Sequence, residues 1–271
     1  MTTKQTHVQN LVHIDEEKTV LHALKDKKSE KDAFTLISRC QLTCGNGKTD
    51  TYFAKVDKTT VFVKGPYKQS DSLRIMIERN EAKKKLGFEV GWMFMIELES
   101  DMWESVPLGI RRNMNVGDKA WFVVCKDLIG VSQKLHTKEK TSKLWPVTQV
   151  VDFDKYEVNE ICDRDLACKE IGMQYVLLLL YRDIFGITDH ASRNFIVDRK
   201  KRIVYSVDED CAEADAKLNK MPAGRRKLIR TFLNENKKDV ETRLHSWSQS
   251  SEKCKVWLSN KSFEDIVALF E

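Results

Sequence analysis

The sequence predicts an α+β protein in two parts, a β-rich part with one main helix and then a mainly helical part. β-Branched and aromatic residues cluster or alternate between Phe34 and Leu128, which is typical of strands. After Asp165 the apolar residues follow a helical spacing, with one short strand pair inserted. A length of 271 residues is near the size at which a single core divides, so two lobes are expected. The predicted segments are a polar N-terminal arm over 1–32, a β-rich lobe over 33–128 and a helical lobe over 129–271.

The β-rich part is expected to form an antiparallel meander, a helix and two further strands. Gly-Asn-Gly and Asp-Lys turns separate its first three β-type segments. Between Asp71 and Leu86, apolar residues lie among Arg, Glu and Lys, which predicts a helix with one buried side that ends at Gly87. The predicted strands cover 34–42, 51–56, 59–64, 92–96 and 120–124.

The helical part is predicted to surround one buried helix over 165–185. Its residues are apolar on most sides, and Gly186 follows as a left-handed helix end. Two short strands, 194–197 and 202–207, then form a hairpin around a charged turn. The last segment, 217–271, is polar with helical spacing, and its expected core residues are Trp247 and Trp257.

The composition excludes several classes of protein. The chain has 46 Lys and Arg against 41 Asp and Glu, and this net charge of +5 is spread among acidic residues. It favours anionic partners only weakly and forms no basic tail of the kind that binds nucleic acid indiscriminately, so a nucleic-acid partner is not expected. Its seven cysteines include no C-x-x-C pair, so neither a disulfide framework nor a zinc knuckle is predicted. No apolar stretch approaches the ~20 residues that span a bilayer, and the N-terminus lacks a signal-peptide core. We expect a cytoplasmic protein with reduced thiols and no transmembrane segment.

Three oxygen-bearing side chains are predicted to converge near the hairpin. Asp189 lies in the loop after the buried helix, and Asn194 stands five positions later where a strand begins. The hairpin then returns Asp208 to the same end. A carboxylate can orient a hydroxyl group and accept its proton, while amide and carboxylate oxygens are suitable ligands for Mg²⁺. This arrangement is typical of phosphoryl transfer.

The same segment resembles the catalytic and metal-binding loops of the protein-kinase-like superfamily. It is most similar to those of the phosphoinositide 3-/4-kinase-like and other atypical kinases, on the residues Gly186-Ile-Thr-Asp189 through Asn194 and Val207-Asp208-Glu209-Asp210. The spacing from Asp to Asn equals that of the kinase catalytic-loop signature. Glu209-Asp210 replace the usual Phe-Gly, and His190 follows the catalytic aspartate.

The resemblance implies a two-lobed protein-kinase-like fold with ATP and Mg²⁺ as cofactors. Asp189 would be the catalytic base, Asn194 and Asp208 would bind the metal, and Asp210 is a candidate additional ligand. His190 is expected either to bind a phosphate or to support the catalytic loop.

The β-rich lobe offers candidates for the remaining kinase elements. Lys64 ends Thr60-Val-Phe-Val-Lys64, which resembles the strand whose lysine contacts the α- and β-phosphates. The pairing carboxylate on the following helix is predicted to be Glu81, with Glu78 as the alternative. Gly45 and Gly47 are the candidate phosphate-covering glycines, and an ordinary Asn-Gly hairpin turn is the alternative interpretation.

Two further segments of the sequence bear on nucleotide binding. Gly47-Lys48-Thr49 resembles the end of a Walker A loop, but the first glycine of that motif is replaced by Leu42 and a strand follows instead of a helix, so a P-loop is rejected. Val124 and Lys126 lie where a hinge between lobes would offer backbone groups to adenine.

The predicted function is therefore that of an ATP- and Mg²⁺-dependent atypical kinase, an enzyme that transfers the γ-phosphate to a hydroxyl acceptor. Acidic residues from Glu209 to Asp215 follow the metal motif and would repel an anionic lipid headgroup, so a protein Ser/Thr hydroxyl is favoured over a lipid. The alternative is a pseudokinase that binds a nucleotide or a partner without turnover. The basic run Arg225-Arg-Lys227 is either an acceptor-binding surface or a solvated helix face.

Overall fold

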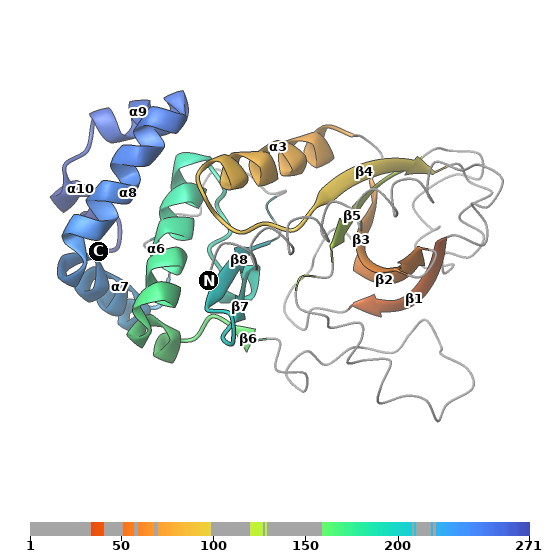
Figure 1. Cartoon of the computed structure of the whole chain (residues 1–271), viewed down its shortest axis with the longest axis horizontal. Coiled ribbons are helices and arrows are strands. Elements are labelled where there is room, and N and C mark those ends of the chain that lie inside the picture. Colours follow the sequence, from red (N-terminus) through yellow and green to blue (C-terminus); the bar gives the residue numbers. More distant parts are fainter. Residues whose placement is uncertain are drawn as a thin grey trace, which may run out of the picture. The chain divides into compact units, whose positions relative to one another are not determined.

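The computed structural model describes residues 34–40, 51–56, 59–67, 70–98, 120–126, 128, 159–207, 209, 218 and 221–271. Within these residues the chain contains helices and two antiparallel sheets (Figure 1), so the α+β part of the predicted fold class is confirmed. The chain divides into two compact units: Met1–Arg74 with Gly91–Glu157, and Ile75–Val90 with Val158–Glu271. The predicted arm over 1–32 lies outside the described residues, and the lobe boundaries stay predictions.

The first unit contains a five-stranded antiparallel sheet in the order β1-β2-β3-β5-β4. The predicted meander is confirmed, because each of the first three strands pairs with the next along the chain. The strands are β1 (Phe34–Cys40), β2 (Thr51–Val56), β3 (Thr59–Tyr67), β4 (Met93–Leu98) and β5 (Ala120–Lys126).

The centre of this sheet is apolar and its register changes once along β3. Val61, Phe122, Val123 and Val124 are buried, as expected for strands with neighbours on both edges. The pairing of β3 with β5 shifts between Lys64 and Tyr67, where the sequence holds Gly-Pro. Proline has no backbone N–H to donate, so an interruption of the ladder is expected there.

Helix α3 (Asp71–Lys85) begins in the first unit and continues into the second. Its first turn is acidic and its last turn is basic, which complements the helix dipole. Gly87 has a φ of +87°, so the predicted helix end is confirmed. Its buried side carries polar as well as apolar residues, namely Leu73, Met76, Arg79, Asn80, Lys83 and Leu86.

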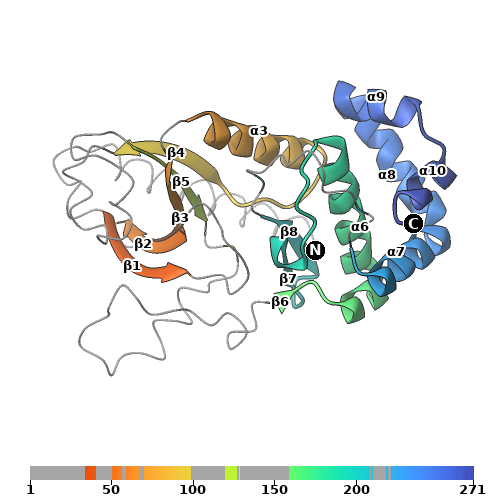
Figure 2. The ribbon, with the colours of Figure 1, turned by 180° about the vertical axis from the view of Figure 1, so that it is seen from behind.

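The second unit is built around helix α6 (Lys169–Ile184), which is the predicted central helix. Its residues from Tyr175 to Arg182 are all buried, and Gly186 beyond it has a φ of +67°. Figures 1 and 2 show α6 between a small sheet on one side and the C-terminal helices on the other. These helices are α7 (Ala223–Glu235), α8 (Lys237–Ser250), α9 (Glu252–Ser259) and α10 (Phe263–Ala268).

The start of the predicted helix over 165–185 is corrected by the structure. Residues Asp163–Ala167 form a separate 3-10 turn, η3, and α6 begins only at Lys169. The cause is Asp165, whose carboxylate accepts from the backbone N–H of Cys162 at 2.8 Å and from Arg199 at 2.7 and 2.8 Å. Burial alone would raise the pKa of Asp165, but these bonds outweigh it and lower that pKa.

The small sheet of the second unit has the order β6-β7-β8. The predicted hairpin is confirmed as β7 (Phe195–Asp198) and β8 (Ile203–Ser206), and β6 (Asn159–Glu160) pairs with β7. At the turn Arg202 has a φ of 56°, and the Asp198 carboxylate accepts from the N–H of Lys201. The hairpin packs on α6 through β8.

One apolar core fills the second unit. Trp247 is buried, as predicted, and its indole N–H donates to the carbonyl of Leu86 at 3.0 Å. Trp257 packs at the edge of this core and donates to the carboxylate of Asp183. Over the part of the chain described, none of the helices has the length and apolar character needed to cross a membrane.

Gly172 of α6 lies against the ring of Phe232 of α7, and this contact yields a stability prediction. A Cβ at this position would lie 2.5 Å from Cε2 of Phe232, whose ring is buried. We expect Gly172→Ala to lower the free energy of unfolding by about 1–3 kcal/mol in urea denaturation, because the core cannot yield without strain. Gly224→Ala in α7 is the matched control, since nothing lies within 4 Å of its Cβ and the change should be neutral or stabilising. Equal effects at both glycines would contradict this prediction.

Candidate functional site

The loop after α6 places Asp189 in a defined turn. The backbone N–H of Ala191 donates to Oδ1 of Asp189 at 3.1 Å, so the carboxylate is held by its own loop. The side chain of Asp189 is partly exposed, as a group that receives a substrate proton must be. The predicted catalytic aspartate therefore combines a held orientation with access to solvent.

Asn194 is buried at the start of β7 and connects this loop to the hairpin. Its side-chain Nδ2 donates to the backbone carbonyl of Asp189 at 3.2 Å, and its own carbonyl accepts from the N–H of Val207 at 2.9 Å. The side-chain amide of Asn194 also carries an oxygen, Oδ1, which is of the kind that binds Mg²⁺. The structure thus brings together Asp189, Asn194 and the residue that precedes Asp208.

The second predicted metal ligand, Asp208, lies outside the described residues, as does Asp210. Within the described residues no group of three His, Cys, Asp or Glu side chains is arranged to hold a metal ion. Asn194 is thus the one predicted metal ligand whose surroundings are defined, and its amide oxygen suits a hard divalent cation.

His190 follows Asp189 and is buried, with 9% of its surface exposed. Burial lowers the pKa of its imidazole to about 4, and the positive charge of Arg182 acts in the same direction. Its Nδ1 atom has no hydrogen-bond partner among the described residues. The imidazole is therefore neutral at physiological pH and is not available as a cationic phosphate ligand.

A cluster of buried charges surrounds Glu209, one residue after Asp208. Lys83 Nζ lies 3.0 Å from Oε1 of Glu209, and Arg182 Nη1 lies 3.9 Å from the same oxygen. The hydroxyl of Ser206 donates to this oxygen as well, at 2.5 Å. Only 5% of the Lys83 side chain and 4% of the Glu209 side chain are exposed, so these ion pairs are shielded from solvent.

Lys83 and Arg182 also bind the backbone before position 208, and a third cation, Arg79, binds the backbone after it. Lys83 donates to the carbonyl of Ser206 at 2.8 Å, and Arg182 donates to the carbonyl of Val207 at 3.1 Å. Arg79 donates to the carbonyl of Glu209 and is itself held at its own carbonyl by the hydroxyl of Tyr181. We call Arg79, Lys83, Arg182, Ser206 and Glu209 the Glu209 cluster.

The location of Glu209 corrects the argument that acids after the metal motif would repel an anionic acceptor. Its carboxylate is buried and paired with Lys83 and Arg182, so it does not present negative charge to an approaching substrate. The other acids in that argument, Asp210, Glu213 and Asp215, lie outside the described residues.

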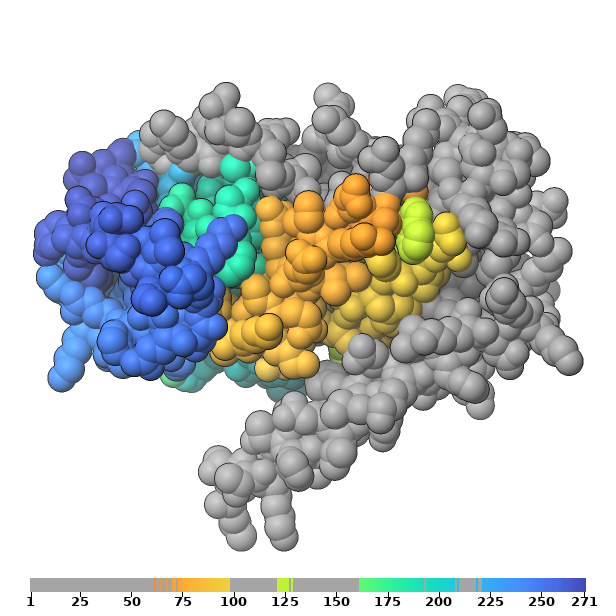
Figure 3. Space-filling view, turned by 90° about the horizontal axis from the view of Figure 1, so that it is seen from above, coloured from red at the N-terminus to blue at the C-terminus, as the bar shows by residue number. Residues whose placement is uncertain are grey.

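The predicted nucleotide-binding residues of the β-rich part are only partly described. Lys64 is half-buried in β3, paired in register with Thr51 of β2 and Val123 of β5. Glu78 and Glu81 lie on the exposed side of α3, whose outer face is seen in Figure 3 (orange). Gly45 and Gly47 lie outside the described residues.

The two residues predicted to line a hinge belong to strand β5. Val124 is buried and pairs with Val63 of β3 and Phe94 of β4. The backbone N–H of Lys126 donates to the carbonyl of Trp92 at 3.1 Å. A role of these residues in adenine binding stays a prediction, and the N–H of Lys126 already has a partner within the sheet.

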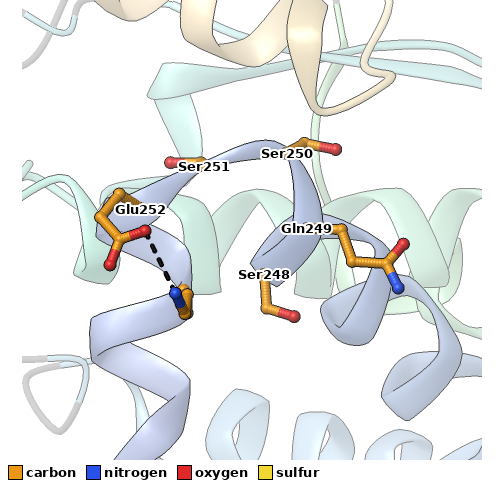
Figure 4. Close-up of a pocket in the computed structure, with 6 residues that line it drawn as sticks. Ser248, Gln249, Ser250, Ser251 and Glu252 are labelled. Carbon is orange, nitrogen blue, oxygen red and sulfur yellow. Dashed lines mark hydrogen bonds and ion pairs between the residues drawn. The ribbon is translucent and has the colours of Figure 1, made fainter.

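A polar depression lies elsewhere in the second unit, where α8 ends and α9 begins. In Figure 4 the hydroxyl groups of Ser250 and Ser251 point in opposite directions, and the one interaction drawn is the ion pair between Glu252 and Lys255 at 3.5 Å. The depression shares no residue with the loop of Asp189. Its lining consists of Ser248, Gln249, Ser250, Ser251, Glu252 and Lys255.

Sequence reasoning missed the Glu209 cluster, although two signals for it existed. Arg182 is the cation inside an otherwise apolar run of α6, where a charge needs a buried partner. Lys83 continues the three- and four-residue spacing of the buried side of α3 from Met76 through Arg79. Neither signal identifies Glu209 as the partner, because Lys83 and Arg182 lie on two other helices and no local pattern links either of them to the residue after Asp208.

Comparison with known protein families and with curated proteins finds no match to this chain. The chemistry of the site must therefore be inferred from its own residues.

Proposed function

We propose that this chain is an ATP- and Mg²⁺-dependent phosphotransferase of atypical-kinase type with a two-lobed protein-kinase-like fold. The observation that carries the proposal is the pair of bonds made by Asn194, which join the loop of Asp189 to the strand that leads into Asp208. A proton acceptor and two oxygen ligands for a metal are the groups that phosphoryl transfer requires.

The order of elements in the β-rich part supports the same proposal. Strand β3 carries Lys64, and helix α3 with Glu78 and Glu81 follows directly. Kinases place their phosphate-binding lysine on the third strand and its glutamate partner on the following helix.

Each residue has a defined role in the proposed reaction. Asp189 orients the acceptor hydroxyl through a carboxylate already held by Ala191. It takes the hydroxyl proton as the acceptor oxygen bonds the γ-phosphorus and the bond from that phosphorus to the bridging oxygen breaks, so that ADP leaves. Lys64 binds the α- and β-phosphates. Asn194 and Asp208 would hold Mg²⁺, which when bound neutralises the charge of the phosphate oxygens.

The proposed acceptor is a protein serine or threonine hydroxyl. The sequence retains Asp210, Glu213 and Asp215 after the metal motif, and such charges repel an anionic headgroup. No basic cluster stands in that stretch to hold a lipid phosphate, since Lys217 is the first cation after Asp208.

The proposal is tested by measuring Mg²⁺-dependent transfer of the γ-phosphate from labelled ATP to a protein or peptide acceptor and to water. We expect Asp208→Ala to lower the rate by roughly 10³-fold or more, because loss of a metal ligand removes several kcal/mol of stabilisation from the transition state. Asp239→Ala is the control, since this exposed aspartate of α8 forms its ion pair with Lys169, which is exposed as well.

Two outcomes would count against the proposed function. Equal transfer by the parent and by Asp208→Ala would show that the metal assignment is wrong. Nucleotide binding by the parent without any transfer would instead identify the chain as a pseudokinase.

A further inference from the structure

The segment that carries Asp208 is bound to helix α3 and helix α6 by buried cations on both of its sides. The carbonyls of Ser206 and Val207, which precede Asp208, accept from Lys83 and Arg182. The carbonyl of Glu209, which follows it, accepts from Arg79. Three backbone carbonyls in four consecutive positions are thus satisfied by side chains from other elements.

The side chain of Glu209 completes this arrangement. Its Oε1 atom receives Ser206 Oγ and pairs with Lys83 and Arg182, so the residue after Asp208 is fixed at both its backbone and its carboxylate. Ion pairs shielded from solvent keep a definite geometry, because a displaced charge would be left buried without a partner. The backbone on each side of Asp208 therefore has little freedom to move independently of α3.

We propose that Lys83 is a positioning residue for the divalent metal, acting through Glu209 and the carbonyl of Ser206 to hold Asp208 at its ligating position. This inference rests on the proposed function, because it takes Asp208 to be a metal ligand. Residues that do not touch the metal but bond and orient its ligands are important for metal affinity. Replacing such a residue commonly weakens metal binding 10- to 100-fold. Lys83 and Arg79 are one turn apart on α3, and both bind the segment that carries Asp208. A shift of this helix would therefore move that segment, so the position of α3 and metal binding are coupled.

The test measures binding of Mn²⁺ to the full chain with ADP by electron paramagnetic resonance, a readout that does not depend on turnover. We expect Lys83→Met, which keeps the length of the side chain, to weaken Mn²⁺ binding about 10- to 100-fold. Lys83→Arg keeps the charge and should restore most of the affinity. Lys84→Met is the matched control, because Lys84 is the exposed neighbour on the same helix.

A second measurement on the parent protein is independent of whether Lys83→Met folds. Coupling between two sites is reciprocal, so Mg²⁺ with ADP should slow hydrogen exchange of the α3 amides over 76–85 relative to ADP alone. Two results would overturn the positioning role and leave the proposed function intact. One is that Mg²⁺ does not change the hydrogen exchange of the α3 amides, and the other is that folded Lys83→Met binds Mn²⁺ as tightly as the parent does. A parent chain that binds no Mn²⁺ with ADP would overturn both.

Discussion

Replacing Asp189 by asparagine is expected to lower the rate of phosphate transfer by about 10²–10⁴-fold and to leave nucleotide binding unchanged. The amide keeps an oxygen at the position of Oδ1, so the bond from the N–H of Ala191 and the shape of the loop are retained. An amide cannot take up the proton of the acceptor hydroxyl. The loss corresponds to about 3–5 kcal/mol of transition-state stabilisation.

Transfer to the acceptor under saturating ATP and Mg²⁺ is the measurement that checks this expectation, with binding of ADP measured separately. Asp198→Asn is the matched control, because Asp198 ends β7 at the turn to β8 and its carboxylate contacts the N–H and the ammonium group of Lys201. A variant at Asp189 that transfers phosphate at the rate of the parent would remove this residue from the mechanism.

Acidification is expected to destabilise the second unit through His190. Burial, and after it the charge of Arg182, lowers the pKa of this imidazole from 6.5 to about 4 in the folded chain. In the unfolded chain His190 is therefore protonated below pH 6.5, whereas in the folded chain it becomes protonated only near pH 4. The stability contributed by neutral His190 is complete above pH 6.5 and is lost as the pH falls toward 4. The full loss is about 3 kcal/mol of unfolding free energy.

Urea denaturation at a series of pH values, compared between the parent and His190→Gln, measures this contribution. The variant has no imidazole at this position, so its stability should fall less steeply across the same interval, while other titrating groups affect both proteins equally. His245→Gln removes an exposed histidine from α8 and should retain the slope of the parent. Parallel curves for the parent and His190→Gln would show that His190 does not resist protonation in the folded chain.

Local patterns predicted most of the elements that surround the candidate site. A long apolar run predicts helix α6. Gly186 predicts its end, because the backbone after a helix often adopts a left-handed conformation, which glycine allows without strain. The hairpin β7–β8 was evident from two short β-type segments around a charged turn. The start of α6 was misplaced, since the bonds that Arg199 makes to Asp165 join residues 34 positions apart.

The contacts of individual side chains were harder to predict from the sequence than the positions of helices and strands. In the sequence Glu209 stands out only as a departure from the kinase pattern, and as one of several acids that follow the metal motif. The structure instead buries it against Lys83 and Arg182, which come from two different helices. Polar residues on the buried side of α3 carried no local signal of what they would bind.

The sequence by itself determined the α+β class, the strand and helix order, and the close spacing of Asp189 and Asn194, because each of these depends on periodicity, turn residues or short distance along the chain. Only the tertiary structure decided that Asn194 bonds both Asp189 and Val207, and that Lys83 and Glu209 form a buried pair. The physical reason is desolvation. A charge removed from water requires a partner, and the fold, not the neighbouring sequence, supplies it.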